Sequence, residues 1–242
     1  MSRVQTRAEE MLARHGFLGV PAETFELAGR GQLIALLDSG LNPESKVLDM
    51  GCGCLRAAYW LIHLLDRGCY HGIEPARRRV EHGLRYLFTA EELRQKEPRF
   101  DFNSHFDSSV FATRFDYFLA GSIWTHASWR QIEATLDSFV RDSTAAGTFL
   151  TSYLPALSAA GANGAAGANG AADANGANGA NGADDDYQGD CWVGTSHESD
   201  TPGVIRHSLT KIVEQCGRRG LRVEELPGAA CDSQLWLRIR RT

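Results

Sequence analysis

The chain has 242 residues, of which 43% are hydrophobic and 23% charged, and its formal net charge is −5. This composition is typical of a globular protein with one large or two small α/β domains, and the acidic balance gives no reason to expect a nucleic-acid partner. No apolar run approaches the roughly 20 residues of a membrane span, and residues 1–17 lack the apolar core of a signal peptide. We therefore expect a cytoplasmic protein without a membrane partner, whose six cysteines are reduced thiols.

Short apolar runs alternate with amphipathic helical stretches along most of the chain. The expected strands are residues 46–50, 69–75, 99–103, 115–123, 147–154, 221–226 and 233–241. The expected helices are residues 55–65, residues 77–94, a helix after the capping box of Ser128 and Gln131, and a helix opened by Thr201-Pro202. Strands separated by helices favour an α/β fold with a doubly wound, mostly parallel sheet. The last two strands have no helix between them, so they are expected to form a C-terminal antiparallel pair.

Two of these helices are predicted from the spacing of their apolar residues. Residues 77–94 place on one face Val80, Leu84, Leu87 and Phe88. The helix opened by Thr201-Pro202 carries Ile205, Leu209, Ile212 and Cys216.

Residues 158–186 differ in composition from the rest of the chain. They repeat Ala-Asn-Gly and contain no apolar side chain larger than alanine. Such a segment cannot bury enough surface to offset its ordering entropy. It is expected to be a flexible loop, either a repeat without function or a mobile lid or spacer.

The sequence VLDMGCGCLR, residues 47–56, leads from a buried strand into a helix through a glycine turn. The glycines at 51 and 53 allow the backbone to approach a ligand closely, and in such sheets the ligand crevice lies beyond the carboxyl ends of the strands. The next strand ends in Glu74, 21 residues past Gly53, where a carboxylate can accept hydrogen bonds from both ribose hydroxyls. Pro75, which follows, suits the first turn of a helix. This order of features predicts a nucleotide-like ligand.

Arg56 argues against a dinucleotide at this turn. The dinucleotide fingerprint G-x-G-x-x-G places its third glycine at this position, where helix and strand pack closely. A ligand without a pyrophosphate has less need of that glycine.

Together with HGIEP, FDYFLAGSIWTHAS and GTFLTSYL, the turn resembles the successive motifs of the class I S-adenosylmethionine-dependent methyltransferases, over roughly residues 44–155. The resemblance implies S-adenosylmethionine as cofactor, with its methionine part near Asp49 and its ribose on Glu74. It leaves the adenine partner open among Asn103, Ser104 and Asp107, and it assigns no contact to Arg56. The cofactor-binding residues that it implies are Asp49, Gly51, Cys52, Gly53, Glu74, Pro75, Ala120, Gly121 and Ser122.

By the same resemblance, residues 1–40 form a helical segment that covers the active site of a methyltransferase domain, residues 41–242. The expected reaction is methyl transfer to a small molecule, with a hydroxyl as acceptor. Beside the N-terminal segment, the pocket would be covered by the stretch after the fifth strand, with Tyr153, Tyr187, Trp192 and His197. The alternatives are an adenosylmethionine-binding protein that transfers no methyl group, as a non-methylating catalyst or regulatory partner, and a nucleotide-dependent oxidoreductase.

His126 is the candidate catalytic residue, because it follows the fourth strand where this fold opens toward the substrate. An unperturbed histidine titrates near 6.5 and can accept a proton from an attacking hydroxyl. In a structural alternative, it caps the next helix or satisfies a buried polar group. Cys52 and Cys54 lack the four-ligand spacing of a zinc site, so no metal is expected and both are interpreted as small side chains beside the cofactor.

Overall fold

The computed structural model describes residues 2–16, 18–156, 204–227 and 234–242. The Ala-Asn-Gly segment, Tyr187, Trp192, His197 and the Thr201-Pro202 helix start lie outside the described residues. Among the described helices, none combines the length and apolar character needed to cross a bilayer.

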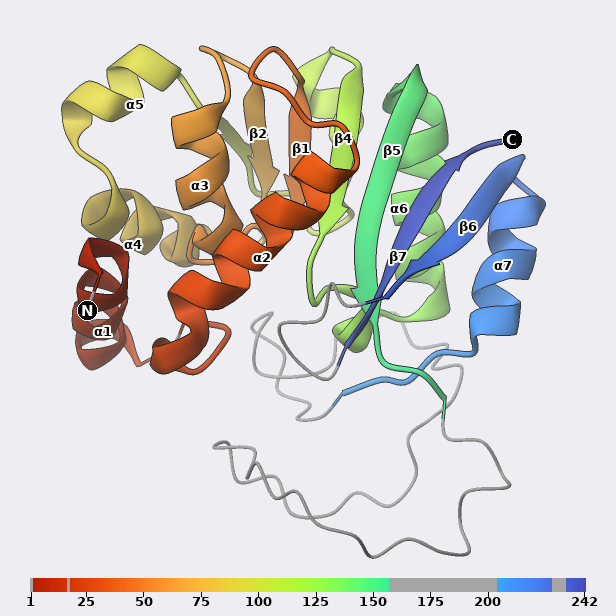
Figure 1. Cartoon of the computed structure of the whole chain (residues 1–242), viewed down its shortest axis with the longest axis horizontal. Helices are drawn as coiled ribbons and strands as arrows, with labels where there is room; N and C mark the ends of the chain where they lie inside the picture. The colour runs from red at the N-terminus through yellow and green to blue at the C-terminus, as the bar shows by residue number, and fades with distance from the viewer. Residues whose placement is uncertain (1, 17, 157–203, 228–233) are drawn as a thin grey trace, which may run out of the picture.

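A single mixed sheet organises the described chain, with strand order β3-β2-β1-β4-β5-β7-β6 (Figure 1). The five strands from β3 to β5 are parallel, whereas β7 is antiparallel to both β5 and β6. The expected doubly wound sheet with its C-terminal antiparallel pair is thus confirmed. The strands are β1 (Val47–Met50), β2 (Tyr70–Ile73), β3 (Arg99–Asp101), β4 (Phe115–Ala120), β5 (Ser143–Tyr153), β6 (Leu221–Leu226) and β7 (Leu235–Arg241).

Helices cover both faces of the sheet (Figure 1). The α-helices are α1 (Arg3–His15), α2 (Phe25–Asp38), α3 (Arg56–Leu64), α4 (Arg77–Leu87), α5 (Ala90–Lys96), α6 (Trp129–Asp142) and α7 (Leu209–Gly217). The short 3₁₀ helices are η1 (Ala22–Thr24), η2 (Ser108–Phe111) and η3 (Trp124–His126). Helices α1 to α4 share one hydrophobic core and α6 and α7 another. Successive strand residues alternate between these cores, as Val47 and Leu48 do, because strand side chains point to opposite faces in turn.

The register brings the ends of the parallel strands to one edge of the sheet. Asp49 of β1 pairs with Gly72 of β2 on one side and Leu119 of β4 on the other. The turns that follow these strands therefore meet at the lower edge of the sheet in Figure 1. This edge is where ligands bind in doubly wound sheets.

The single helix predicted for residues 77–94 is wrong. Helix α4 ends at Leu87, Phe88 is extended, and Thr89 begins α5 with a capping box that it forms with Glu92. The apolar spacing continues through the break because Phe88 remains buried beside the rings of Tyr59 and His63. The pattern Thr-x-x-Glu is a helix start signal, and it marks this break in the sequence.

The last helix starts later than predicted. Ser208 caps α7, so Ile205 lies outside the helix. The backbone N–H of Ile205 donates to Thr125, and that of His207 donates to Leu154. These bonds tie residues 205–207 in extended form to the ends of η3 and β5, which prevents a helix there. The capping box of Ser128 and Gln131 at α6 is confirmed.

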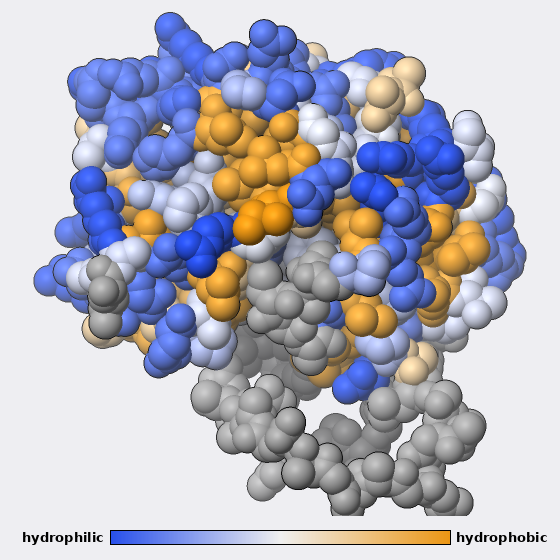
Figure 2. Space-filling view, in the orientation of Figure 1, coloured by the Kyte–Doolittle hydropathy of each residue, from blue (hydrophilic) through white to orange (hydrophobic). Residues whose placement is uncertain are grey.

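Helix α2 crosses the face of the molecule that is seen in Figure 2. This view shows an apolar area in the middle of that face, and the exposed apolar side chains of α2 are Leu27, Ile34 and Leu37. The inner side of the helix approaches α3 closely at Gly29. A Cβ at Gly29 would lie 2.3 Å from the carbonyl oxygen of Arg56, the first residue of α3.

We expect Gly29→Ala to destabilise the protein by about 1–3 kcal/mol, because the added methyl group would overpack against fixed backbone. Helix propensity alone would make alanine more stable than glycine by about 1 kcal/mol. A loss of stability in Gly29→Ala would therefore show the close contact between Gly29 and the backbone of Arg56. The measurement is urea denaturation. Gly217→Ala at the end of α7 is the control, since a Cβ there meets nothing within 4 Å. A Gly29→Ala protein as stable as the control would contradict the close packing of α2.

Candidate functional site

The turn between β1 and α3 needs glycine for two different reasons. Gly51 has a φ of 70°, and a Cβ on it would lie 1.9 Å from Cδ1 of Ile123, which follows β4. Gly53 has a φ of 53°, but the nearest atom to its Cβ position is 3.9 Å away. Positive φ disfavours other residues at both positions. Gly51 is therefore packed from the side of β4, while a Cβ on Gly53 would make only an ordinary contact with the carbonyl oxygen of Gly51.

Glu74 joins the end of β2 to this turn. Its carboxylate accepts a hydrogen bond of 2.9 Å from the N–H of Gly53 and one of 3.0 Å from the N–H of Ala76. The side chain is 1% exposed, and the guanidinium of Arg79 lies 4.0 Å from it. A carboxylate has about four acceptor positions, and these backbone bonds use one on each oxygen. The fold thus brings Gly53 and Glu74 together, as the cofactor prediction requires.

Pro75 does not lie in the first turn of α4, as the sequence had suggested. Ala76 is the N-cap and Arg77 the first helical residue, so Pro75 precedes the helix. The N-cap residue, Ala76, has no side chain that can cap the helix. The N–H of Ala76 donates instead to the buried carboxylate of Glu74.

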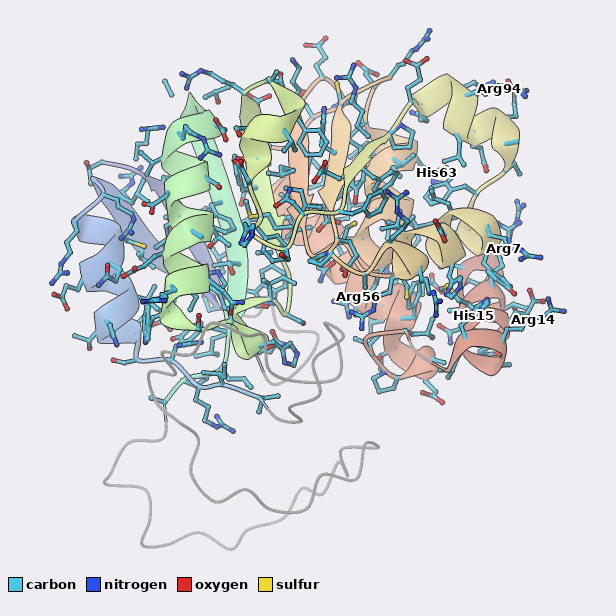
Figure 3. All side chains as sticks on the ribbon, turned by 180° about the vertical axis from the view of Figure 1, so that it is seen from behind. Arg7, Arg14, His15, Arg56, His63 and Arg94 are labelled. Carbon is cyan, nitrogen blue, oxygen red and sulfur yellow. The ribbon has the colours of Figure 1, made fainter. Side chains whose placement is uncertain are left out.

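Asp49 lies buried beneath the turn. The hydroxyl of Tyr70 donates to its carboxylate over 2.9 Å. Burial raises the pKa of Asp49 from 3.8 to about 7, the Tyr70 hydrogen bond and the Arg56 cation lower it, and Glu74 raises it further. Figure 3 shows Arg56 near this edge of the molecule, apart from Arg7, Arg14 and His15 of α1.

The two cysteines of the turn are buried as thiols. Burial raises the pKa of Cys52 well above its usual range and that of Cys54 to about 12. The sulfur of Cys52 fills the space beside Gly72 of β2, where a Cβ would lie only 2.9 Å from it. Within the described ranges, no group of three His, Cys, Asp or Glu side chains is placed to hold a metal ion.

A closed ring of hydrogen bonds holds the chain after β4. The N–H of Ser122 donates to Ser152 over 2.8 Å, the Ser152 hydroxyl donates to Gln234 over 2.7 Å, and the Gln234 amide donates to the Ser122 hydroxyl over 2.8 Å. Ser122 has a φ of 63°, which is uncommon for a residue with a side chain. The ring compensates this strain and joins the turn after β4 to the end of β5 and the residue before β7.

The three candidates for the adenine contact have different surroundings. The Asn103 side chain organises its own loop, donating to Asp101 and accepting from the N–H of Asp107. Asp107 caps η2 and pairs with Arg141 over 2.6 Å, while Ser104 is exposed. The choice among them stays open.

His126 ends η3 and is partly exposed. It does not cap the following helix, because Ser128 does so. Nearby, His207 is fully buried and its Nε2 lies 2.8 Å from the carbonyl oxygen of Trp124, so the ring ties residues 205–207 to η3. Sequence reasoning missed this histidine because it placed the position inside a helix.

Helix α2 supplies one more polar group that the sequence analysis did not identify. A Cβ on Gly121 would lie 2.3 Å from Nε2 of Gln32 and 3.4 Å from the ring of Trp236. The amide of Gln32 therefore lies directly over Gly121, at the end of β4. No spacing in the sequence marks this contact.

No protein-family model and no curated protein sequence matches the chain. Solved structures do match its fold. Magnesium protoporphyrin IX methyltransferase from Synechocystis PCC 6803 with bound SAH (S-adenosylhomocysteine) aligns with a TM-score of 0.56 at 11% identity, covering 98% of this chain and 94% of that one. The DhpI–SAH complex gives 0.57 at 13% identity, covering 98% and 93%. A ribosomal protein L11 methylase from Lactobacillus delbrueckii subsp. bulgaricus gives 0.54 at 11% identity, covering 94% and 83%.

These matches show that the chain has the fold of the S-adenosylmethionine-dependent methyltransferases, as the resemblance implied. Two of the matched structures contain SAH. One enzyme is named for a porphyrin and another for a ribosomal protein. The fold alone therefore does not determine the acceptor.

The raised pKa of Asp49 makes stability depend on pH. Below about pH 4 the carboxyl is protonated in the folded and unfolded chains alike. Between 4 and 7 only the unfolded chain ionises, so stability falls as the pH rises through this window. Asparagine does not ionise, so Asp49→Asn removes this fall in stability with rising pH. From pH 5 to pH 8, we expect its stability advantage over the wild type to grow by on the order of 2–3 kcal/mol.

The measurement is urea denaturation of both proteins at the two pH values, since contributions from other groups cancel in the difference. A stability gap that does not change with pH would mean that Asp49 is ionised in the folded chain throughout.

Proposed function

We propose that this chain is an S-adenosylmethionine-dependent methyltransferase whose acceptor is a small molecule with a hydroxyl group. The observation that carries the proposal is the bond between Gly53 and Glu74 at the carboxyl edge of the sheet. It places a glycine backbone next to a buried carboxylate, where the strand order reverses between β1 and β4. Residues 1–40, which include helix α2, would then cover the active site.

The residues present fit the cofactor. The Glu74 carboxylate lies at the carboxyl end of β2, bound to the backbone of Gly53, and it would accept hydrogen bonds from the two ribose hydroxyls. The backbone of Gly53, where a Cβ position is not crowded, would lie against the part of the cofactor that joins ribose and sulfur. Asp49, Cys52 and Pro75 would shape the wall beneath it, and Ala120, Gly121 and Ser122 the wall beyond β1.

When bound, the cofactor supplies an electrophilic methyl group on a sulfonium. The chain has to align the acceptor oxygen with that group and exclude water, which accounts for much of the rate advantage in such reactions. As the new C–O bond forms, the acceptor hydroxyl loses its proton. His126, on the segment that follows β4, would accept this proton and release it to water.

Calorimetric titration with S-adenosylmethionine, SAH and NAD tests the cofactor. We expect the two sulfur ligands to bind at micromolar concentration and NAD to bind more weakly. Glu74→Gln should weaken both sulfur ligands at least tenfold, because an NH₂ group would replace one carboxylate oxygen and the charge would be lost. Glu81→Gln on the exposed side of α4 is the control and should change neither affinity.

A folded wild-type protein that binds neither sulfur ligand would contradict the proposal, and preferential NAD binding would favour the oxidoreductase. A protein that binds the cofactor but releases no SAH with any acceptor would instead be a non-methylating binder, and SAH release with acceptors other than hydroxyl compounds would contradict the hydroxyl acceptor alone.

His126→Gln tests the proton acceptor, once an acceptor has been found by its dependent release of SAH. We expect kcat to fall about 10²- to 10⁴-fold, while the affinity for SAH stays unchanged. His105→Gln, at an exposed position after β3, is the matched control. An unchanged kcat and pH profile in His126→Gln would remove His126 from the mechanism.

A further inference from the structure

Gln32 is the one polar side chain among the buried residues of α2. The other buried residues of the helix are Phe25, Ala28, Gly29, Ala35 and Leu36. Gln32 is only 5% exposed. Within residues 2–16, 18–156, 204–227 and 234–242, no hydrogen bond to its side chain is formed. The amide atoms of Gln32 are not among the enclosed side-chain atoms that lack a partner, so the amide of this otherwise buried side chain reaches solvent-accessible space. An amide placed there on an apolar helix face is available to bind a polar ligand group.

The amide is directed at the end of β4. Its Nε2 would lie 2.3 Å from a Cβ on Gly121, and the Trp236 ring approaches the same point to 3.4 Å. One helical turn earlier, Gly29 packs against the backbone of Arg56. These two close approaches hold α2 against the start of α3 and the end of β4, with Gln32 on the side that faces Gly121.

A second polar group lies beside it. In the hydrogen-bond ring after β4, the Ser122 hydroxyl accepts from Gln234, so its own proton is not used within the ring. No described residue accepts that proton. Gln32 and Ser122 therefore flank Gly121 with hydrogen-bonding groups.

The order of the strands relates this place to Glu74. Glu74 follows β2, the glycine turn follows β1, and Gly121 follows β4, and these three strands are neighbours. Adjacent strands lie about 4.8 Å apart, so the ends of β2 and β4 are about 10 Å apart. A ligand with its ribose on Glu74 that crosses Gly53 reaches Gly121 with its far end. In S-adenosylmethionine this far end is the amino-acid group, a few bonds beyond the sulfur.

We propose that the Gln32 amide binds the amino-acid end of the cofactor, which makes helix α2 part of the cofactor site. An amide suits this group because its oxygen can accept from the ammonium and its NH₂ can donate to the carboxylate. The Ser122 hydroxyl, on the other side of Gly121, would donate a second hydrogen bond to the carboxylate. The inference rests on the proposed function, since it assumes that the ribose lies on Glu74.

Two ligands separate this contact from the rest of the site. SAH carries the amino-acid group, whereas 5′-methylthioadenosine has the same adenosine and sulfur without it. In calorimetric titrations, Gln32→Leu should weaken SAH binding about tenfold or more and leave methylthioadenosine binding unchanged. Arg30→Gln, at an exposed position on the same helix, is the control and should change neither affinity.

Thermal unfolding gives an independent readout. Leucine is close to glutamine in size and cannot form hydrogen bonds. We therefore expect Gln32→Leu to keep the unfolding midpoint of the ligand-free protein at or above that of the wild type and to reduce the further rise caused by SAH. A residue with a merely structural role would lower the midpoint when it is replaced.

Two results would overturn the inference while leaving the cofactor proposal intact. They are unchanged SAH binding in Gln32→Leu, and equal losses of SAH and methylthioadenosine binding. Unchanged SAH binding together with a lower kcat/KM for the acceptor would place Gln32 on the acceptor instead. If the folded wild-type protein binds neither ligand, the proposed function fails, and this inference fails with it.

Discussion

The candidate site depends on the hydrogen bond from the backbone of Gly53 to the carboxylate of Glu74. The bond is possible because β1 and β2 are parallel neighbours in register, so the turns after them emerge at one edge. A carboxylate that is 1% exposed needs such donors, and Ala76 provides a second one. Glu74 therefore holds the glycine turn and the start of α4 in place before any ligand arrives.

The parts of the site that could be predicted from the sequence lie within short, continuous stretches of the chain. Strand, glycine turn, helix and terminal acid follow one another within residues 46–75, and the fold only has to pair two adjacent strands to bring Gly53 to Glu74. Local signals also identify the start of α6 at Ser128. They fail at residues 77–94, where buried Phe88 continues the apolar spacing through a break that Thr89 and Glu92 mark.

The remaining parts depend on contacts between distant segments. Ser152 and Gln234 are 82 residues apart in the sequence, and Trp124 and His207 are 83 apart. Gln32 comes to Gly121 only because α2 packs closely against the start of α3. Tertiary packing decides which of many similar polar residues meet, so nothing in their local sequence distinguishes them. The same holds for Ile123, whose side chain fills the space that Gly51 leaves.

The burial of Cys52 and Cys54 has a consequence for chemical compatibility. A thiolate is a strong nucleophile, and only this ionised form of cysteine reacts readily with alkylating agents. With its pKa raised to about 12, Cys54 is ionised at pH 7 in on the order of one molecule in 100,000, and the pKa of Cys52 is also raised well above its usual range. With the proposed cofactor bound, a methylating sulfonium would lie beside two sulfur atoms that burial keeps protonated. Burial would thus protect the turn from self-methylation.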